Sequence, residues 1–187
     1  RMSVAANAQF INLDKPGPDQ TWDYSGLTEV SQFVDTYQSL SDLPGIYNLL
    51  RLQKDVDYGK QEAALLDNLP GSDQIPIDEV LGFYSKESDS YQQAAFGVAL
   101  LGQDVPVPFQ DNDRIYQLPI TYQQKDSSNA FVQFPPNDIP FPGTLDLYFE
   151  EARKRVNHVD AWGTLTTPYG TFETLRVRTV VEREDSV

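Results

Sequence analysis

The chain contains no cysteine and only one histidine among its 187 residues. Without cysteine it can form no disulfide bond, no thiolate nucleophile and no cysteine-based zinc site. The single histidine, His158, excludes any site that needs two histidines from one chain. We therefore expect neither a metal ion nor another cofactor.

Basic residues and long apolar runs are scarce as well. Lys and Arg number 14 against 28 Asp and Glu, which gives an acidic chain with a formal net charge of -14. A field of this sign repels phosphate backbones, so we expect no nucleic-acid partner. No apolar run approaches the roughly 20 residues that a membrane-spanning helix needs. We therefore expect no transmembrane segment.

The residues that are abundant favour a β-rich fold. Hydrophobic residues make up 40% of the chain, and its 10 Tyr, 10 Phe and 13 Pro suit strands joined by many turns. We predict a mainly β fold, an antiparallel sandwich or partly open barrel with one or two short helices. A length of 187 residues predicts one β-rich domain that spans residues 1–187.

The clearest local signal is a β-hairpin over residues 159–178. Two runs of strand-forming residues flank the sequence Thr-Pro-Tyr-Gly at 167–170. Pro168 suits the second position of a type I turn, and Gly170 suits the left-handed conformation that follows it. We predict a three-residue loop with a glycine bulge. The cross-strand pairs are then Thr167–Thr171, Leu165–Glu173, Gly163–Leu175 and Ala161–Val177.

This register gives the hairpin an apolar and a polar face. The residues expected to face inward are Val159, Ala161, Leu165, Leu175, Val177 and Val181. On the polar face we predict Asp160 opposite Arg178 and Trp162 opposite Arg176, in reach of a salt bridge and an Arg–Trp stack. These four residues are a candidate ligand site for a sugar or an anion. The favoured alternative is a solvated face tied by cross-strand pairs, because structural ion pairs outnumber binding sites.

Two shorter motifs also carry polar side chains. Trp22 beside Asp23 resembles a sugar-stacking site, and Trp22 is therefore a further candidate ligand-binding residue. A buried Trp with an Asp that caps a turn is the favoured alternative. Asp111-Asn112-Asp113 offers oxygen ligands but lacks the glycine and the distal glutamate of a twelve-residue calcium loop. We expect no metal there.

The first half of the chain gives weaker secondary-structure signals. Short strands are predicted at 8–13 and 21–24. A helix is predicted at 58–69, where a run of helix-forming residues ends at Pro-Gly. A second hairpin is predicted over 80–101, with a polar turn at 86–89.

The second half is dominated by prolines and by one ambiguous segment. Between 105 and 142, prolines recur at positions 106, 108, 119, 135, 136, 140 and 142. Because a proline donates no ladder hydrogen bond, we expect this region to be irregular or edge-like, with short strands such as 115–118 and 130–134. The polar stretch 150–157 fits either a turn or the far end of a long strand that leads into the hairpin.

Two segments resemble a known group of proteins. Residues 14–27, DKPGPDQTWDYSGL, resemble the G-x-N-Q-T-W-D-F-S-x-L opening of uncharacterised exported proteins, with Asp19 in place of Asn. Residues 160–178 resemble the D-G-W-G-T-L-x-x-P-x-G-T-F-x-x-L-R-V close of the same group, with Ala161 in place of Gly. These proteins occur in bacteria of the Bacteroidetes type and often carry a C-terminal sorting domain for type IX secretion. The resemblance implies export and supplies no activity.

Three functions fit these observations. We expect a secreted or cell-surface β-rich module with a non-catalytic interaction or structural role, since Gly-x-Ser-x-Gly turns and glycine-rich phosphate loops are missing. The alternatives are a protein that binds or hydrolyses glycans, and a carrier of an apolar ligand in a curved aromatic-rich sheet. The partner expected under the first two is a glycan or a cell-surface component.

Overall fold

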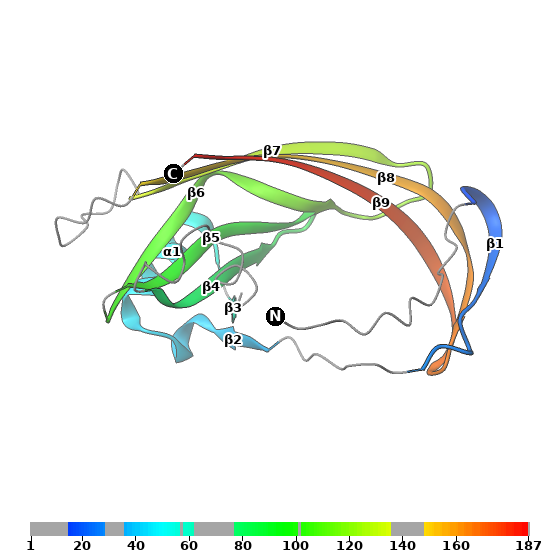
Figure 1. The fold of residues 1–187 in the computed structure, drawn as a ribbon, viewed down its shortest axis with the longest axis horizontal. Coiled ribbons are helices and arrows are strands. Elements are labelled where there is room, and N and C mark those ends of the chain that lie inside the picture. Colours follow the sequence, from blue (N-terminus) through cyan, green and yellow to red (C-terminus); the bar gives the residue numbers. More distant parts are fainter. Residues whose placement is uncertain are drawn as a thin grey trace. The chain divides into compact units, whose positions relative to one another are not determined.

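The computed structural model describes residues 15–28, 36–56, 58–61, 77–100, 102–135 and 148–186 (Figure 1). The described chain is mainly β with one short α-helix, which confirms the predicted fold class. The strand predicted at 8–13 lies outside the described residues. The elements in chain order are β1 (Gly17–Asp23), β2 (Tyr37–Ser39), two 3-10 turns (Leu40–Asp42 and Gly45–Tyr47), α1 (Asn48–Lys54), β3 (Tyr58–Gln61), β4 (Ile77–Lys86), β5 (Ser90–Leu100), β6 (Gln103–Gln117), β7 (Lys125–Phe134), β8 (Phe149–Thr167) and β9 (Gly170–Ser186).

Most strand pairs are antiparallel. The strands pair in the order β1-β8-β7-β6-β5-β4-β3-β2, and β9 also pairs with β8. From β2 to β7 each strand runs antiparallel to its neighbour, whereas β1 runs parallel to β8.

The chain divides into two compact units. The described part of the first comprises residues 15–28, 121–125 and 157–178, and the rest of the described chain belongs to the second. Because β8 and β9 each contribute residues to both units, the prediction of a single domain stays a prediction.

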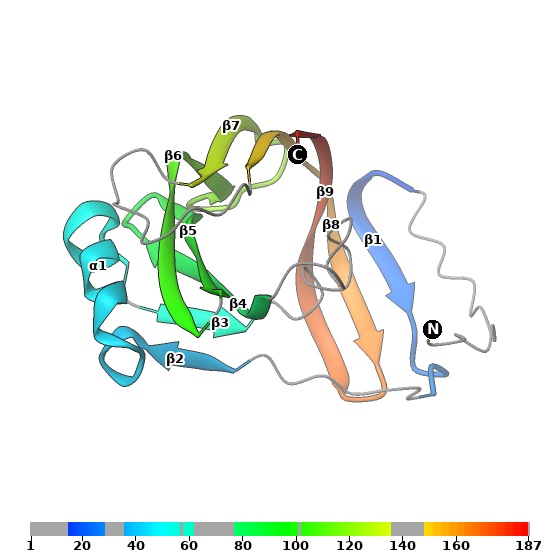
Figure 2. The same cartoon turned by 60° about the vertical axis from the view of Figure 1, so that its left-hand side comes forward.

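In the first unit, β8 lies between β1 and β9 (Figure 2). The strand predicted at 21–24 corresponds to the end of β1, which pairs with residues 163–166 of β8. At Gly163 a side chain would collide with the backbone of Gln20, so this position needs a glycine for the two backbones to approach. Trp22 on β1 is buried.

The hairpin at 159–178 is confirmed, but its loop is shorter than predicted. β8 ends at Thr167 and β9 begins at Gly170, so two residues connect the strands instead of three. Thr167 closes this turn, because its Oγ1 accepts a hydrogen bond from Tyr169 N and donates one to Gly170 O. Gly170 has a positive φ of 144°, but it lies at the start of the strand instead of in the loop.

The shorter loop shifts the register near the turn by one residue. Thr164 Oγ1 donates a 3.0 Å hydrogen bond to Glu173, for which Leu165 was the predicted partner. The hydroxyls of Thr166 and Thr171 lie 3.3 Å apart, whereas Thr167 was predicted opposite Thr171. A shift of one residue moves side chains to the other face of a strand. The predicted assignment of faces is therefore wrong for this part of β9.

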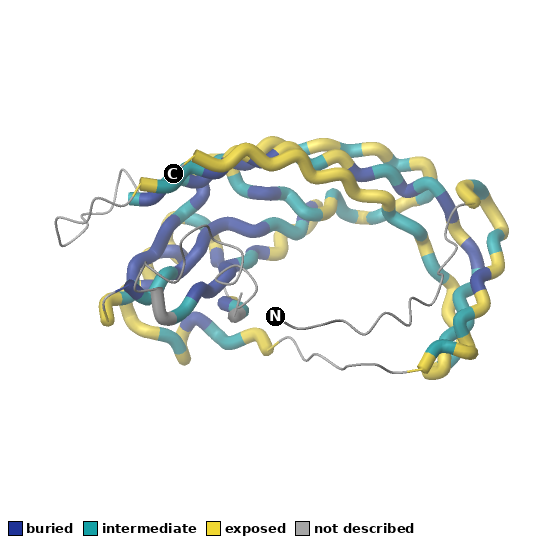
Figure 3. Tube along the Cα trace, viewed as in Figure 1, coloured by how far each residue is buried: buried dark blue, intermediate teal, exposed yellow. Residues whose placement is uncertain are grey.

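Burial along the hairpin follows the prediction on β8 and departs from it on β9 (Figure 3). Val159 and Ala161 are buried, as predicted for the apolar face. Leu175 and Val181, predicted to face inward, are 41% and 42% exposed. All residues from 178 to 186 are exposed. In the described part of the chain, β9 pairs with β8 alone.

The second unit contains two apolar clusters. The first joins β4, β5, β6 and β7 through Phe96, Phe109, Val132 and their neighbours. The second places Tyr47 and Leu50 against Phe83 of β4. The hairpin predicted over 80–101 is confirmed as β4 and β5, which are joined by a turn at residues 87–89.

The helix predicted at 58–69 is wrong at its beginning, because residues 58–61 form β3 between β2 and β4. Residues 62–69 lie outside the described residues. Pairing with a strand on each side overrides the local helix-forming composition. A Cβ at Gly59 would lie 2.8 Å from Leu43 and 2.9 Å from Phe83, so this position suits glycine. The helix of the described chain is α1, at residues 48–54.

The prediction of an irregular proline-rich region is wrong for 103–117. β6 is one strand of 15 residues that runs through Pro106 and Pro108, opposite Gly97 and Ala95 of β5. Its pairing with β7 lies beyond these prolines, at Asp111 opposite Phe131. A proline fits a strand where no partner needs its N–H. The ambiguous stretch 150–157 is the far end of a long strand, β8.

Candidate functional site

The structure joins two of the predicted site residues. Arg176 Nε and Nη2 donate to Asp160 Oδ1 and Oδ2 at 2.7 and 2.8 Å, a bidentate ion pair. The hydrogen bonds from Arg176, more than any other cause, hold the pKa of Asp160 below its usual value. The predicted partner of Asp160 was Arg178, and this pairing is wrong. That pairing was based on the three-residue loop, and the shorter turn changes the register on which it depends.

The other predicted site residues do not share one environment. Trp162 is 36% exposed and Arg178 is also exposed, whereas Trp22 is buried. Asp23 accepts a 2.9 Å hydrogen bond from Ser25 N, and hydrogen bonding to Ser25 lowers the pKa of Asp23. The favoured alternative for this motif, a buried Trp beside an Asp that caps a turn, is confirmed. Ligand binding by the hairpin face stays a prediction.

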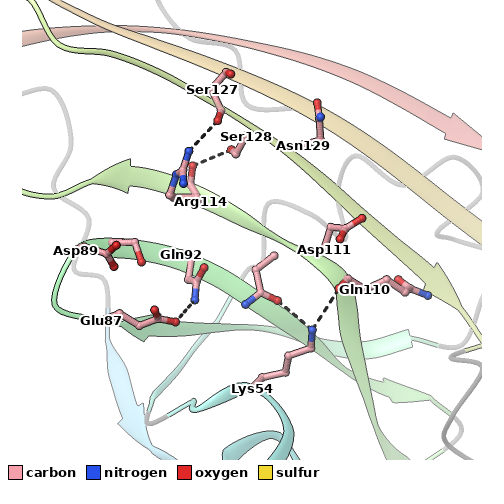
Figure 4. Close-up of a pocket in the computed structure, with 12 residues that line it drawn as sticks. Lys54, Glu87, Asp89, Gln92, Gln110, Asp111, Arg114, Ser127, Ser128 and Asn129 are labelled. Carbon is pink, nitrogen blue, oxygen red and sulfur yellow. Dashed lines mark hydrogen bonds between the residues drawn. The ribbon is translucent and has the colours of Figure 1, made fainter.

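A polar groove of about 660 Å³ lies on the second unit (Figure 4). It is bordered by the end of α1, the β4–β5 turn and parts of β5, β6 and β7. Every one of its lining residues has a polar or charged side chain: Lys54, Glu87, Asp89, Ser90, Gln92, Gln110, Asp111, Asn112, Arg114, Ser127, Ser128 and Asn129. Sequence reasoning missed this groove, because its residues come from segments up to 75 positions apart.

Hydrogen bonds across elements hold the groove walls. Lys54 Nζ donates to Asn112 Oδ1 at 3.2 Å and to Gln110 O at 3.5 Å, which ties α1 to β6. Burial lowers the pKa of Lys54, and the charge of Asp111 opposes this effect. On the β4–β5 hairpin, Gln92 Nε2 donates a 2.6 Å hydrogen bond to Glu87.

Arg114 links β6 to β7 at the groove. Its Nη2 donates to Ser127 O at 2.8 Å, and Ser128 Oγ donates to Arg114 O at 3.0 Å (Figure 4). Its Nε is buried and has no hydrogen-bond partner among the described residues. A buried donor without a partner costs free energy. The Nε–H of Arg114 could therefore gain from a hydrogen bond to a bound molecule.

Alternation along the strands places a charge cluster on the opposite face. Gln92 pairs in register with Arg114, and the next pair, Gln93 with Asp113, points to the other side. Asp113 is 1% exposed. Arg155 Nε and Nη2 donate to its two carboxylate oxygens at 2.9 and 2.8 Å.

Arg153 is the centre of this cluster. Its Nη1 donates to Gln93 Oε1 at 3.0 Å and to Asp113 Oδ2 at 3.2 Å, and its Nε pairs with Glu151. Its guanidinium also lies over two aromatic rings, 5.5 Å from the centroid of Phe96 and 5.3 Å from that of Phe109. This cluster fastens β8 to β5 and β6, the strands that carry much of the groove.

The ionisation of Asp113 follows from these contacts. Burial alone raises the pKa of a carboxyl group, but the hydrogen bonds and charges of Arg155 and Arg153 outweigh it and lower the pKa of Asp113. Asp113 is therefore a structural anion. One feature of the sequence indicates this cluster: charged residues stand at alternate positions 151, 153 and 155.

Three further observations bear on function. No helix in the described part of the chain has the length and apolarity that a membrane span needs. A search of the described residues finds no group of three or more His, Asp or Glu side chains placed to hold a metal ion. No protein-family model, curated protein or solved structure matches the chain.

Proposed function

We propose that the protein is a secreted or cell-surface β-rich module with a non-catalytic binding role, and that its polar groove binds a glycan. The observation that carries this proposal is the wholly polar lining of a groove of about 660 Å³. The resemblance of residues 14–27 and 160–178 to exported proteins supports the extracytoplasmic location.

The chemistry of the lining suits a ligand rich in hydroxyl groups. Sugar hydroxyls both donate and accept hydrogen bonds, and the groove offers acceptors from carboxylates, donors from Lys54 and Arg114, and both from amides. Its two cationic and three anionic residues nearly balance, which favours a neutral ligand over a strongly charged one. An apolar ligand would leave these groups without partners, at a cost in free energy.

The internal hydrogen bonds of the groove favour binding over catalysis. Lys54 is held by Asn112, and Glu87 is held by Gln92. These contacts fix side chains in the walls before a ligand arrives, which reduces the entropy lost on binding. A carboxylate that is already held by a hydrogen bond, such as that of Glu87, can still accept hydrogen bonds from sugar hydroxyl groups.

The proposal is tested by screening the full chain on an array of neutral and acidic glycans, followed by titration calorimetry with the best ligand. Gln110 and Gln103 form a matched pair, because both are exposed residues of β6 but only Gln110 lines the groove. We expect Gln110→Ala to weaken the affinity about tenfold, the value of roughly one well-placed hydrogen bond. Gln103→Ala should bind as the wild type does.

Two outcomes would contradict the proposal. One is that no glycan on the array binds, while a fatty acid or another apolar probe does. The other is that the affinity changes equally in Gln110→Ala and Gln103→Ala. Slow cleavage of a bound glycan, detected as new reducing ends, would overturn the non-catalytic part.

A further inference from the structure

Arg114 differs from the other arginines of the described chain that are at least partly buried. Arg153, Arg155 and Arg176 each form an ion pair with a carboxylate. Arg114 is partly buried too, yet its guanidinium pairs with no carboxylate of the described residues and donates to Ser127 O instead. A partly buried charge without a counter-charge is costly. Arg114 therefore leaves a positive charge in the groove wall that the described part of the chain does not neutralise.

One edge of the Arg114 guanidinium, formed by Nε and Nη2, is incompletely used. Nε has no partner among the described residues, and Nη2 has one bond, to Ser127 O, for its two hydrogens. In Arg155 the same edge binds both carboxylate oxygens of Asp113. Hydrogen bonds of this charged, forked kind are roughly twice as strong as neutral ones. A carboxylate is therefore the group that suits this edge best.

The neighbours of Arg114 in the groove are neutral or engaged elsewhere. Gln92 lies opposite Arg114 in the register of β5 and β6, and it donates its side-chain amide to Glu87. Asp111 stands three residues earlier on β6, about 10 Å along the strand. On β7 the nearest contacts are serines (Figure 4). A carboxylate for Arg114 would thus come from a bound molecule.

We infer that the glycan held in this groove carries a carboxylate, as in a uronic acid or a sialic acid, and that Arg114 binds it. This inference rests on the proposed function, because it names the class of glycan that the groove selects. Side-chain rotamers commonly change on binding, and a rotation of Arg114 would turn Nε–H toward the groove that this residue lines. The three acidic residues of the lining would repel further carboxylates, so the ligand carries one acidic sugar among neutral ones.

The inference is tested by calorimetric titration of the full chain with two probes. One is an oligosaccharide with a single terminal glucuronic acid, and the other ends in a single sialic acid. Each is compared with its carboxyl-reduced form, in which a hydroxymethyl group replaces the carboxylate. We expect the wild type to bind at least one acidic probe about ten- to a hundredfold more tightly than its reduced form, the value of hydrogen bonds to a charged group.

The preference for the acidic form over the reduced form is the readout for the variants. A variant that is merely damaged loses affinity for both forms alike and keeps this ratio. In Arg114→Gln the two forms should bind nearly equally. Arg114→Lys keeps the charge but not the fork, so it should retain only a small part of the preference. Arg51→Gln removes the same charge from exposed α1, outside the groove lining, and should keep the full preference.

The possible failures separate this inference from the proposed function. Equal binding of the acidic and reduced forms by the wild type would overturn the inference and leave the glycan groove intact. A full preference in Arg114→Gln, or in Arg114→Lys, would also overturn it, since the carboxylate would then bind elsewhere or respond to charge alone. The same holds if neutral glycans of the array bind while neither acidic probe does. If no glycan binds at all, the proposed function fails as well.

Discussion

Two ion-paired regions of this protein differ in burial and in the distance that separates their partners along the chain. In the second unit, Arg153 and Asp113 are 40 residues apart in sequence, and their side chains are 6% and 1% exposed. In the first unit, Asp160 and Arg176 belong to one hairpin, and their side chains are 9% and 16% exposed. The first pair belongs to a cluster of several residues, whereas the second is a single bidentate pair.

This difference shows how a β-rich chain uses charge inside and near its surface. A buried charge loses its hydration, so it needs several partners, and Arg153 has Gln93, Asp113, Glu151 and two aromatic rings. In an ion pair near solvent, water can hydrate one charge when the other is lost, so the loss costs little free energy. We therefore expect the buried cluster to be essential to the second unit and the hairpin pair to be a minor contribution to the first.

The largest effect should come from Asp113→Ala. This change leaves Arg153 with Glu151 as its one printed anionic partner and removes both hydrogen bonds that Arg155 donates to Asp113. Breaking a buried charge pair by removing one partner costs about 3–5 kcal/mol of unfolding free energy. Urea denaturation followed by circular dichroism measures this loss.

The matched control is Asp111→Ala, on the same strand and two residues away. Asp111 is exposed, so its loss should change the free energy of unfolding by about 0.5 kcal/mol or less. Equal losses in the two variants would show that the buried cluster is no more important than a surface carboxylate, and the comparison would fail.

An intermediate effect is expected from Gly163→Ala in the first unit. Here backbone pairing, instead of buried charge, holds β1 to β8, and an added Cβ would collide with the backbone of Gln20. Overpacking of this kind costs about 1–3 kcal/mol. In a Trp162→Phe background, the emission of buried Trp22 should shift to longer wavelength as β1 loosens.

Gly26→Ala is the control for this change, because a Cβ there would meet no atom within 4 Å. It should leave both the emission maximum and the urea midpoint of the Trp162→Phe background unchanged. A Gly163→Ala variant with the same emission and midpoint as Gly26→Ala would refute the close contact between β1 and β8.

The same contrast explains which features could be predicted from the sequence. Local signals identified both hairpins and the short strand around Trp22, because turn residues and alternation lie within 20 positions of one another. The register of the β8–β9 turn was missed, since a bond from Thr167 to its own turn fixes a two-residue loop. Propensity also failed at 58–61, where pairing with β2 and β4 decides the conformation.

The candidate site was harder to predict than the fold. Its groove combines α1 with strands that become neighbours only after the sheet forms. The cluster around Arg153 needs Gln93, which lies 60 residues away, and no local pattern encodes this distance. By contrast, the residues of the Asp160–Arg176 pair lie 16 positions apart on one hairpin, and both were identified from the sequence.

The smallest effect should come from Asp160→Asn, and it should depend on pH. Because Arg176 lowers the pKa of Asp160 in the folded state, the pair stabilises the fold fully above the unfolded pKa of about 3.9. This contribution is lost as the pH falls through the folded pKa. At pH 7 we expect Asp160→Asn to cost about 0.5–1 kcal/mol. The difference from the wild type should shrink steadily below pH 4. Urea denaturation from pH 7 to pH 3 measures it, and a difference that stays constant over this range would mean that the charge of Asp160 contributes nothing to the hairpin.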